Sequence, residues 1–257
     1  MAHDMAQSGV KERVSPEEWA IREDLAAAYR LVHNFGWDDL IYTHISARVP
    51  GEEHAFLLNP LGLTFDEICA SNLVKIDHEG NKLMDSPWKV NRAGFVIHSA
   101  VHEARPDALC ALHLHSDFGV AVSMQQDGLL PASQTAIIAL AGVAYHDYEG
   151  IATRDDEKER LVKNLGNSFN LILRNHGTLS IGRSVGEAFQ RMYFLEKACR
   201  YQILATSGGK VLNQVAEEAF ANVAAGQATI GRSTRTQNGA WAGLRRRLDR
   251  TEPDYKD

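Results

Sequence analysis

The sequence predicts an α/β domain in which helices flank a mostly antiparallel sheet. Helices are indicated by capping patterns such as Ser15-Pro16-Glu17-Glu18 and Ser184-Val185-Gly186-Glu187, each followed by apolar residues at helical spacing. Strands are indicated by short apolar runs that end at turn residues, such as Ala55 to Leu58 before Asn59-Pro60. A hairpin pattern over residues 73–84 makes the early part of the sheet antiparallel.

Composition and charge argue against several classes of protein. The chain has 257 residues, of which 44% are hydrophobic and 23% are charged, as in ordinary globular proteins. Its net charge of -6 argues against a surface that neutralises phosphates, so no nucleic-acid partner is expected. No apolar stretch approaches the length of about 18 residues that a membrane helix needs, so no membrane association is expected. Three cysteines without a CxxC spacing indicate a reduced, cytoplasmic protein.

The chain is expected to divide into three parts. Residues 1–14 are polar and are predicted to be a flexible N-terminus, residues 15–225 to form the main domain, and residues 226–257 to form a C-terminal extension. The extension contains Trp241 and the basic run Arg245-Arg246-Arg247, which is more typical of a solvated or interface surface than of an acid-binding site.

Each element has a local signal in the sequence. The first helix is expected to run from its N-cap Ser15 to a stop at Gly36, and the longest helix from Ser184 to about Thr206. Further helices are expected over residues 91–104, 116–124, 134–140, 155–165 and 211–224, with a short acidic one at 66–67; strands are expected over residues 41–49, 55–58, 73–76, 82–84, 108–115, 143–148, 169–173 and 178–181.

Two histidines in the run Ala111-Leu112-His113-Leu114-His115 are the first candidate metal ligands. If this run is a strand, both side chains point to the same face, because side chains alternate with period 2. A third imidazole is available at His176, which follows an apolar run within Asn175-His176-Gly177. Three imidazoles with an open position are the arrangement of catalytic zinc sites.

A structural role for the histidine pair is the alternative. Half-buried imidazoles often bond to backbone carbonyls without binding any ligand. That alternative is weakened here, because two neutral imidazoles on one face would need several separate hydrogen-bond partners. His44 and His98 are further candidates for either role, whereas the histidines at positions 3, 33, 54, 78 and 102 are expected to be surface or structural residues.

Other kinds of site have weaker support. Phosphate binding depends only on the glycine turn around Gly62 and on Asn91-Arg92, and neither matches a Walker loop or a dinucleotide fingerprint. No Gly-x-Ser-x-Gly elbow occurs, and no cysteine lies near a histidine in a way that indicates a thiol nucleophile.

Three separated stretches resemble the class II aldolase and adducin family. They are residues 91–123, 143–151 and 171–181, and the similarity extends over residues 19–209. Within that family the chain is most similar to the adducin head-domain branch, whose Tyr-Asn-His-Ile, His-Ile-His and Arg-Asn-His-Gly runs resemble residues 42–45, 113–115 and 174–177. The resemblance implies a three-layer αβα sandwich with a mostly antiparallel central sheet, and a homotetramer with sites near subunit interfaces.

The resemblance also implies a metal site, with one departure. In the family's sugar-phosphate enzymes an acidic residue on a helix, a His-x-His pair and the histidine of an Asn-His-Gly turn surround a zinc. Carried over, the histidines are His113, His115 and His176, and the acidic residue falls on Gly94, which can neither bind metal nor move a proton. The family's Gly-Asn-x-Ser phosphate loop is Thr43-His44-Ile45-Ser46 here. Cleavage of a phosphorylated ketose by the usual route is therefore not expected.

Two functions from different classes remain. The first is a metal-dependent, lyase- or isomerase-like enzyme acting on a small hydroxy-carbonyl or carboxylated substrate, in which the metal stabilises an enediolate. Its cofactor is expected to be a divalent metal, zinc first, with manganese, iron, nickel or cobalt as alternatives. The second is a non-catalytic, adducin-like assembly module with a structural or vestigial metal site. The expected proton-transfer residues are His44, His98, Tyr148 and Glu149, and the expected substrate contacts are Thr43, Ser46, Gly62, Asn91 and Arg92.

Overall fold

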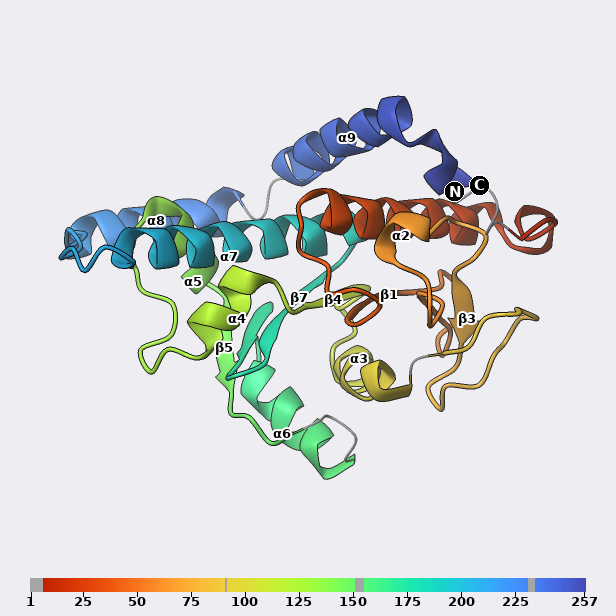
Figure 1. Ribbon diagram of the computed structural model, residues 1–257, viewed down its shortest axis with the longest axis horizontal. Helices are drawn as coiled ribbons and strands as arrows, with labels where there is room; N and C mark the ends of the chain where they lie inside the picture. Colours follow the sequence, from red (N-terminus) through yellow and green to blue (C-terminus); the bar gives the residue numbers. More distant parts are fainter. Residues whose placement is uncertain (1–6, 91, 151–154, 231–233) are drawn as a thin grey trace.

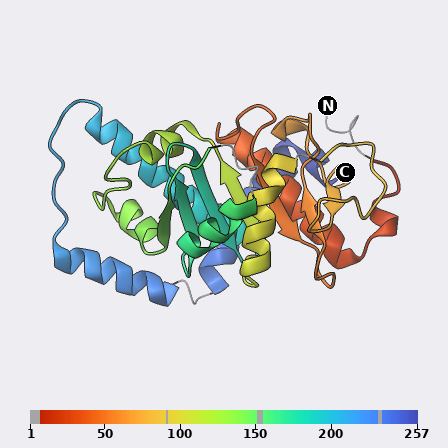
Figure 2. The same cartoon turned by 90° about the horizontal axis from the view of Figure 1, so that it is seen from below.

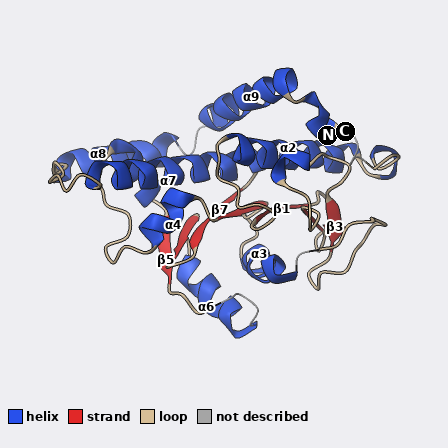
Figure 3. Ribbon diagram, viewed as in Figure 1, coloured by secondary structure: helices blue, strands red, loops and turns tan. Residues whose placement is uncertain are grey.

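A seven-stranded sheet lies between two layers of helices in the computed structural model, which describes residues 7–90, 92–150, 155–230 and 234–257 (Figure 1, Figure 3). In chain order the strands are β1 (His44–Arg48), β2 (Phe56–Leu58), β3 (Val74–Ile76), β4 (Cys110–Leu114), β5 (Val143–His146), β6 (Asn170–Leu173) and β7 (Gly177–Gly182). Their spatial order is β3-β2-β1-β4-β7-β6-β5, and among these pairings β5 with β6 is parallel while the others are antiparallel. The predicted fold class is confirmed.

The helices form the two outer layers. On one face lie α2 (Pro16–Asn34), α4 (Asp117–Ser123), α5 (Gln134–Leu140) and α7 (Val185–Thr206), and on the other lie α3 (Arg92–Ala104) and α6 (Asp155–Leu165). Figure 2 shows the sheet from the side of α3 and α6. Near the C-terminal end of the chain, α8 (Glu217–Ile230) lies beside α5, and α9 (Thr234–Thr251) lies outside α2 and α7. Short 3-10 turns occur at η1 (Lys11–Arg13), η2 (Phe65–Glu67) and η3 (Pro253–Lys256). Over the described ranges, no helix combines the length and apolar character needed to cross a membrane.

Both predicted capping patterns start a long helix. The Ser15 hydroxyl accepts a hydrogen bond from the Glu18 amide at 3.0 Å, and the Ser184 hydroxyl accepts one from the Glu187 amide at 3.1 Å. These bonds satisfy amides that the first turn of a helix leaves without an intrahelical partner. The first residues of α2 and α7, two of the helices on this face of the sheet, are thus fixed by local sequence.

Three predicted elements differ from the structure. The strand expected from residue 41 begins only at His44, because Leu40 and Thr43 have φ of 53° and 67°, which a strand cannot contain. The strand expected over residues 82–84 reduces to a single bridge between Ile76 and Lys82, so β3 remains the edge strand of the sheet and its ladder is with β2. The helix expected from Val211 begins at Glu217, where two acidic residues occupy the first turn and favour a helix N-terminus.

Tyr29 joins α2 to the middle of the sheet. Its side chain is fully buried, and its hydroxyl accepts a hydrogen bond from the Ile45 amide at 2.7 Å. The hydroxyl also lies 2.5 Å from the Ile45 carbonyl and 2.9 Å from the Asn59 side-chain oxygen, either of which can accept its proton. This contact places β1 under α2 at the strand that also carries His44.

Replacing Tyr29 by Phe is expected to destabilise the fold by about 1–3 kcal/mol, because buried backbone groups of Ile45 lose their partner. Urea unfolding followed by circular dichroism measures this change. Tyr201→Phe is the matched control, because Tyr201 is 45% exposed. Equal stability of the two variants would contradict the structural role of the Tyr29 hydroxyl.

Candidate metal centre

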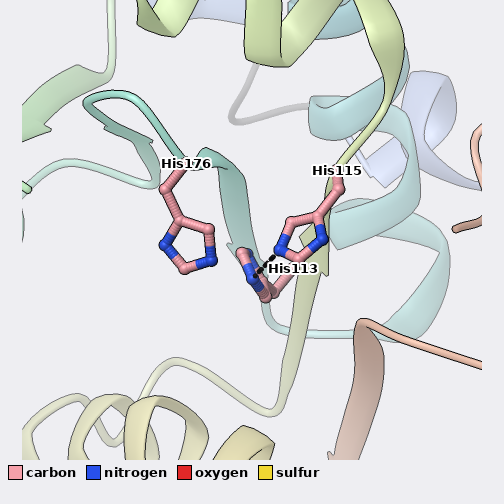
Figure 4. A group of neighbouring side chains, drawn as sticks. All are labelled: His113, His115 and His176. Carbon is pink, nitrogen blue, oxygen red and sulfur yellow. Dashed lines mark hydrogen bonds between the residues drawn. The ribbon is translucent and has the colours of Figure 1, made fainter. Parts of the chain in front are cut away.

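Three imidazoles meet at one end of the central strands. His113 lies on β4, and His115 follows directly after the end of this strand. His176 lies in the three-residue turn between β6 and β7, and β7 pairs with β4 so that Thr178 is opposite Leu114. The register of β4 and β7 therefore brings the turn beside the histidine pair (Figure 4).

The three side chains form a nearly regular triangle. Their ring centroids are separated by 4.8 Å (His113 to His115), 4.8 Å (His113 to His176) and 4.9 Å (His115 to His176). One nitrogen from each ring lies within 4.8 Å of the other two, and among the described residues this is the one group of three or more potential ligands. The group can hold a single metal ion.

The outer nitrogens of two of these rings are already committed. Nδ1 of His113 lies 3.1 Å from the Thr178 carbonyl oxygen, which can only accept, so this nitrogen carries the proton. Nδ1 of His115 likewise donates to the Asp39 carboxylate at 2.9 Å. Nε2 of each ring therefore points toward the other, and the two Nε2 atoms lie 3.1 Å apart.

This arrangement fits a divalent metal. The two Nε2 atoms are close enough to share one proton in a hydrogen bond or to bind one metal ion between them. Two ligand nitrogens of a tetrahedral zinc are separated by about 3.3 Å, since each lies about 2.0–2.1 Å from the ion. Bonds from the outer ring nitrogen to a carbonyl and to a carboxylate are also the usual support of metal-binding histidines.

Burial and mutual repulsion favour the neutral form of two of the three imidazoles, those of His113 and His176. Burial is the main cause that holds the pKa of His113 well below its usual value, and the neighbouring imidazoles of His176 and His44 add to it. Burial also lowers the pKa of His176 to about 4, with a smaller contribution from His115. Neutral imidazole is the form that binds metal.

Thr178, whose carbonyl accepts the hydrogen bond from His113, is itself held from the α7 side. Its hydroxyl donates to the Glu196 carboxylate at 3.2 Å. Glu196 is 2% exposed, and burial raises the pKa of its carboxyl group to about 7. This carboxyl group therefore supports β7 directly behind the imidazole site.

A second group of polar side chains lies beside the three imidazoles, between β1 and α3. We call this group the histidine seam; it consists of His44 and Ser46 on β1 and His98 and His102 on α3. His44 is paired with His113 across the two strands, and its ring centroid is 5.5 Å from that of His113 and 4.5 Å from that of His98. All four side chains are 5% exposed or less. The seam thus continues the imidazole site into the protein interior.

The other predicted site residues have varied surroundings. Thr43 is 3% exposed, and its hydroxyl has no hydrogen-bond partner among the described residues. Ser46 is 1% exposed, and its hydroxyl contacts two imidazoles of the seam. Gly62 lies in a turn with φ of 103°. Asn91 lies outside the described residues, and Arg92 is the first residue of α3.

Tyr148 and Glu149 follow β5 but differ in their contacts. The Tyr148 ring is 56% exposed, and its centroid lies 6.4 Å from that of His176. The Glu149 carboxylate accepts a hydrogen bond from Arg160 at 2.7 Å and lies 3.9 Å from His146. Tyr148 therefore lies on the solvent side of the imidazole site, whereas Glu149 is engaged with α6.

Asp39 is the residue that sequence reasoning missed. It precedes β1 in a tight turn, in which the Tyr42 amide bonds to the Asp39 carbonyl at 2.8 Å. The positive φ of Leu40 and Thr43 folds this turn back over the end of β4, where the carboxylate meets His115. Nothing in the sequence run Trp37-Asp38-Asp39-Leu40 distinguishes Asp39 from Asp38.

The fold and the site together place this protein in a class of domains: layered α/β domains with a three-histidine metal site at the end of the central strands. Residues 23–203 match the family described as Class II Aldolase and Adducin N-terminal domain. The chain belongs to this family, as the resemblance predicted.

Relatives of two kinds are similar to this chain. A Caulobacter vibrioides protein described as a "Putative aldolase class 2 protein" is 53% identical over 96% of each chain. Mouse alpha-adducin is 49% identical over 75% of this chain, which corresponds to 27% of the adducin. Among solved structures, an aldolase II superfamily protein from Pseudomonas syringae has a TM-score of 0.91 and 49% identity, and covers 96% of this chain and 99% of its own. An L-fuculose 1-phosphate aldolase from Glaciozyma antarctica has a TM-score of 0.81 and 26% identity, and covers 98% and 96%.

Gly177→Ala is expected to weaken metal binding by displacing the His176 turn. A Cβ atom at this position would lie 2.4 Å from the Leu114 carbonyl oxygen and 3.1 Å from the His115 ring, so backbone must shift. Asn175, not Gly177, takes the positive φ of the turn, so the glycine is needed for close approach. Competition with a coloured zinc chelator measures the affinity. Gly208→Ala is the control, because a Cβ atom there meets nothing within 4 Å.

Asp39→Asn is expected to lower zinc affinity by about 10- to 100-fold, because the variant loses the charged acceptor that orients His115. The same chelator titration measures it. Asp38→Asn is a matched control in the neighbouring residue, whose carboxylate bonds to His33 instead. If both variants bind zinc as tightly as the original chain, Asp39 does not support the metal site.

Proposed function

We propose that this protein is a metal-dependent, lyase- or isomerase-like enzyme that acts on a small hydroxy-carbonyl or carboxylated substrate. The observation that carries the proposal is the triangle of His113, His115 and His176, in which one nitrogen from each ring lies within 4.8 Å of the other two. Two of these rings also have Nδ1 engaged with the Thr178 carbonyl and the Asp39 carboxylate, which turns Nε2 of each ring toward the other at 3.1 Å. Ligand imidazoles that are supported in this way are typical of metal sites.

His113, His115 and His176 would hold a divalent ion, zinc first, with manganese, iron, nickel or cobalt as alternatives. When bound, the ion supplies Lewis-acid polarisation of substrate oxygens and stabilises the negative charge of an enediolate. The carbonyl of Thr178 and the carboxylate of Asp39 keep two of the ligand rings in the tautomer that faces the substrate side. Three protein ligands leave coordination positions open for a substrate.

A typical sugar-phosphate aldolase activity is not part of the proposal. The relative from Glaciozyma antarctica is named as an L-fuculose 1-phosphate aldolase, but at 26% identity it differs from this chain at most positions. The family's acidic position is Gly94 here, and a glycine cannot move a proton. The proton must therefore be transferred by another group.

Candidates for proton transfer lie on two sides of the imidazole triangle. Tyr148 lies next to His176 on the exposed side, and a phenol there can protonate a leaving oxygen or a carbanion. His44 lies next to His113 on the buried side, and His98 lies next to His44. Glu149 is a weaker candidate, because its carboxylate is paired with Arg160. Thr43, with its buried and unpartnered hydroxyl, would contact the substrate.

We further propose a homotetramer in the cytoplasm. This proposal is supported by Leu40 and Tyr42, which are 70% and 55% exposed and place apolar surface on the turn that carries Asp39. The three cysteines are all free and buried, as in a reduced compartment. No nucleic-acid or membrane partner is proposed.

A non-catalytic, adducin-like assembly role is the second candidate. The 49% identity to mouse alpha-adducin over 75% of this chain favours it, because that relative carries the same domain within a much longer protein. In this alternative the metal would be structural or absent. The two candidates differ in whether the metal site binds a small molecule.

Protein purified without a histidine tag is expected to contain about one divalent ion per chain, because the residues that the structure describes offer one group of three ligands. His113→Ala and His115→Ala should each remove the ion and abolish turnover of a panel of aldol, α-hydroxy acid and carboxylated aromatic substrates. Mass spectrometry of the metal and coupled assays are the measurements.

His33→Ala is the control for these variants, because His33 is 44% exposed and contacts only Asp38 among the ion pairs described. It should keep both metal and turnover. Metal binding without turnover on any substrate would favour the assembly role. Absence of metal, with unchanged folding of the His113 and His115 variants, would contradict the metal site itself.

A further inference from the structure

The histidine seam contains a hydrogen-bond chain with a defined direction. The Ala108 carbonyl can only accept, so Nδ1 of His102, which lies 2.7 Å away, carries the proton. His102 is 1% exposed, and burial lowers its pKa to about 3, so its ring is neutral and its Nε2 is an acceptor. The hydroxyl of Ser46, 2.7 Å from this nitrogen, must donate to it.

The direction of the chain determines the proton position on His98. A serine hydroxyl has a single proton, and the Ser46 hydroxyl uses it to donate a hydrogen bond to Nε2 of His102. The Ser46 oxygen can then only accept from Nδ1 of His98, which lies 2.5 Å away. Because the buried His98 ring is neutral, its Nε2 carries a lone pair and no proton.

Nε2 of His98 is therefore an acceptor without a donor. His98 is 1% exposed, and no hydrogen-bond partner for this atom occurs in the part of the chain that the structure describes. Buried polar atoms are nearly always satisfied in folded proteins, so an exception needs an explanation. The His98 ring contacts His44, and His44 contacts His113 of the metal centre. The acceptor thus belongs to the polar region that starts at the imidazole triangle.

The other members of this hydrogen-bond chain are rigidly held. The His102 ring stacks on Phe56 with a centroid separation of 4.8 Å, and the His102 carbonyl accepts a hydrogen bond from Arg48. Ser46 lies in β1, which is paired with β4 on one side and with β2 on the other. Reversing the direction of the bonds would require a proton on Nε2 of His102. That would either charge the buried ring or leave its Nδ1 unprotonated against the Ala108 carbonyl oxygen, and both are unfavourable.

We propose that Nε2 of His98 accepts a hydrogen bond from a hydroxyl group of the metal-bound ligand, and that Ser46 and His102 are positioning residues that fix His98 in this tautomer. The inference rests on the proposed metal-dependent function and narrows its substrate class to compounds with a hydroxyl next to the chelating oxygens. Ser46, first expected to touch the substrate, acts through His98 instead. The ligand thereby meets a neutral acceptor one helical turn after Gly94, the position at which the family's sugar-phosphate enzymes have a carboxylate.

Two small hydroxamates test the ligand contact. Both chelate zinc through two oxygens, but glycolohydroxamate carries an adjacent hydroxyl that acetohydroxamate lacks. Isothermal titration of the zinc-loaded full chain should show about tenfold tighter binding of glycolohydroxamate, as expected for one additional hydrogen bond. In Ser46→Ala and in His102→Phe the preference should disappear while zinc content is unchanged.

The tautomer is tested independently. Long-range proton–nitrogen correlation spectra of histidine-labelled protein should show His98 protonated at Nδ1 in the original chain and at Nε2 in His102→Phe, where the Ser46 hydroxyl is free to donate to Nδ1. Ser46→Thr keeps the hydroxyl and should restore both tautomer and preference. Ser180→Ala is the control, since it removes a buried hydroxyl that bonds to Asn170, away from the seam.

Each outcome decides between the proposals. Equal binding of the two hydroxamates to the original chain, or a proton on Nε2 of His98 in it, would overturn the role of His98 and leave the proposed function intact. Binding of zinc but of neither hydroxamate would overturn the proposed function, and with it the inference. A preference that survives in both Ser46→Ala and His102→Phe would show that these residues do not position His98.

Discussion

The antiparallel pairing of β4 with β7 is the constraint on which the site depends. It sets Leu114 opposite Thr178, which places the Thr178 carbonyl at Nδ1 of His113 and brings the turn with His176 beside His115. A slip of one residue would turn His113 to the opposite face of the sheet and replace it with an apolar neighbour. Both faces of β4 are buried, so apolar packing on the α7 side holds the register that the imidazoles need.

Backbone strain is concentrated around this site. In the described part of the chain, the non-glycine residues with positive φ are Leu40, Thr43 and Asn175. The first two shape the turn that carries Asp39 to His115, and the third shapes the turn that carries His176. Such conformations cost free energy and persist only where the surrounding structure holds them. The strands provide a rigid base, and the strained turns add His176 and the Asp39 carboxylate that supports His115.

Loss of the carboxylate at Gly94 changes the chemistry available to this member of the family. The neighbouring polar groups are the imidazoles of the buried seam: burial lowers the pKa of His98 and His102, which Ser46 links, and the His44 ring lies between His98 and His113. A neutral acceptor can orient a hydroxyl, but it attracts a proton less strongly than a carboxylate in the same place. The metal site would then contribute most of the charge stabilisation, and proton transfer would depend on groups such as Tyr148.

Sequence alone determined the fold class, the family and the three imidazoles that the structure brings together. These features depend on local signals: the serine caps at Ser15 and Ser184, the period-2 spacing in β4, and the Asn-His-Gly turn. Only the tertiary structure decided which groups support those imidazoles. Asp39 and the Thr178 carbonyl are ordinary in sequence, and they gain their roles because a turn with positive φ angles and the strand register bring each of them to a particular ring nitrogen. Hydrogen bonds between residues far apart in the chain depend on three-dimensional packing, for which no local pattern exists.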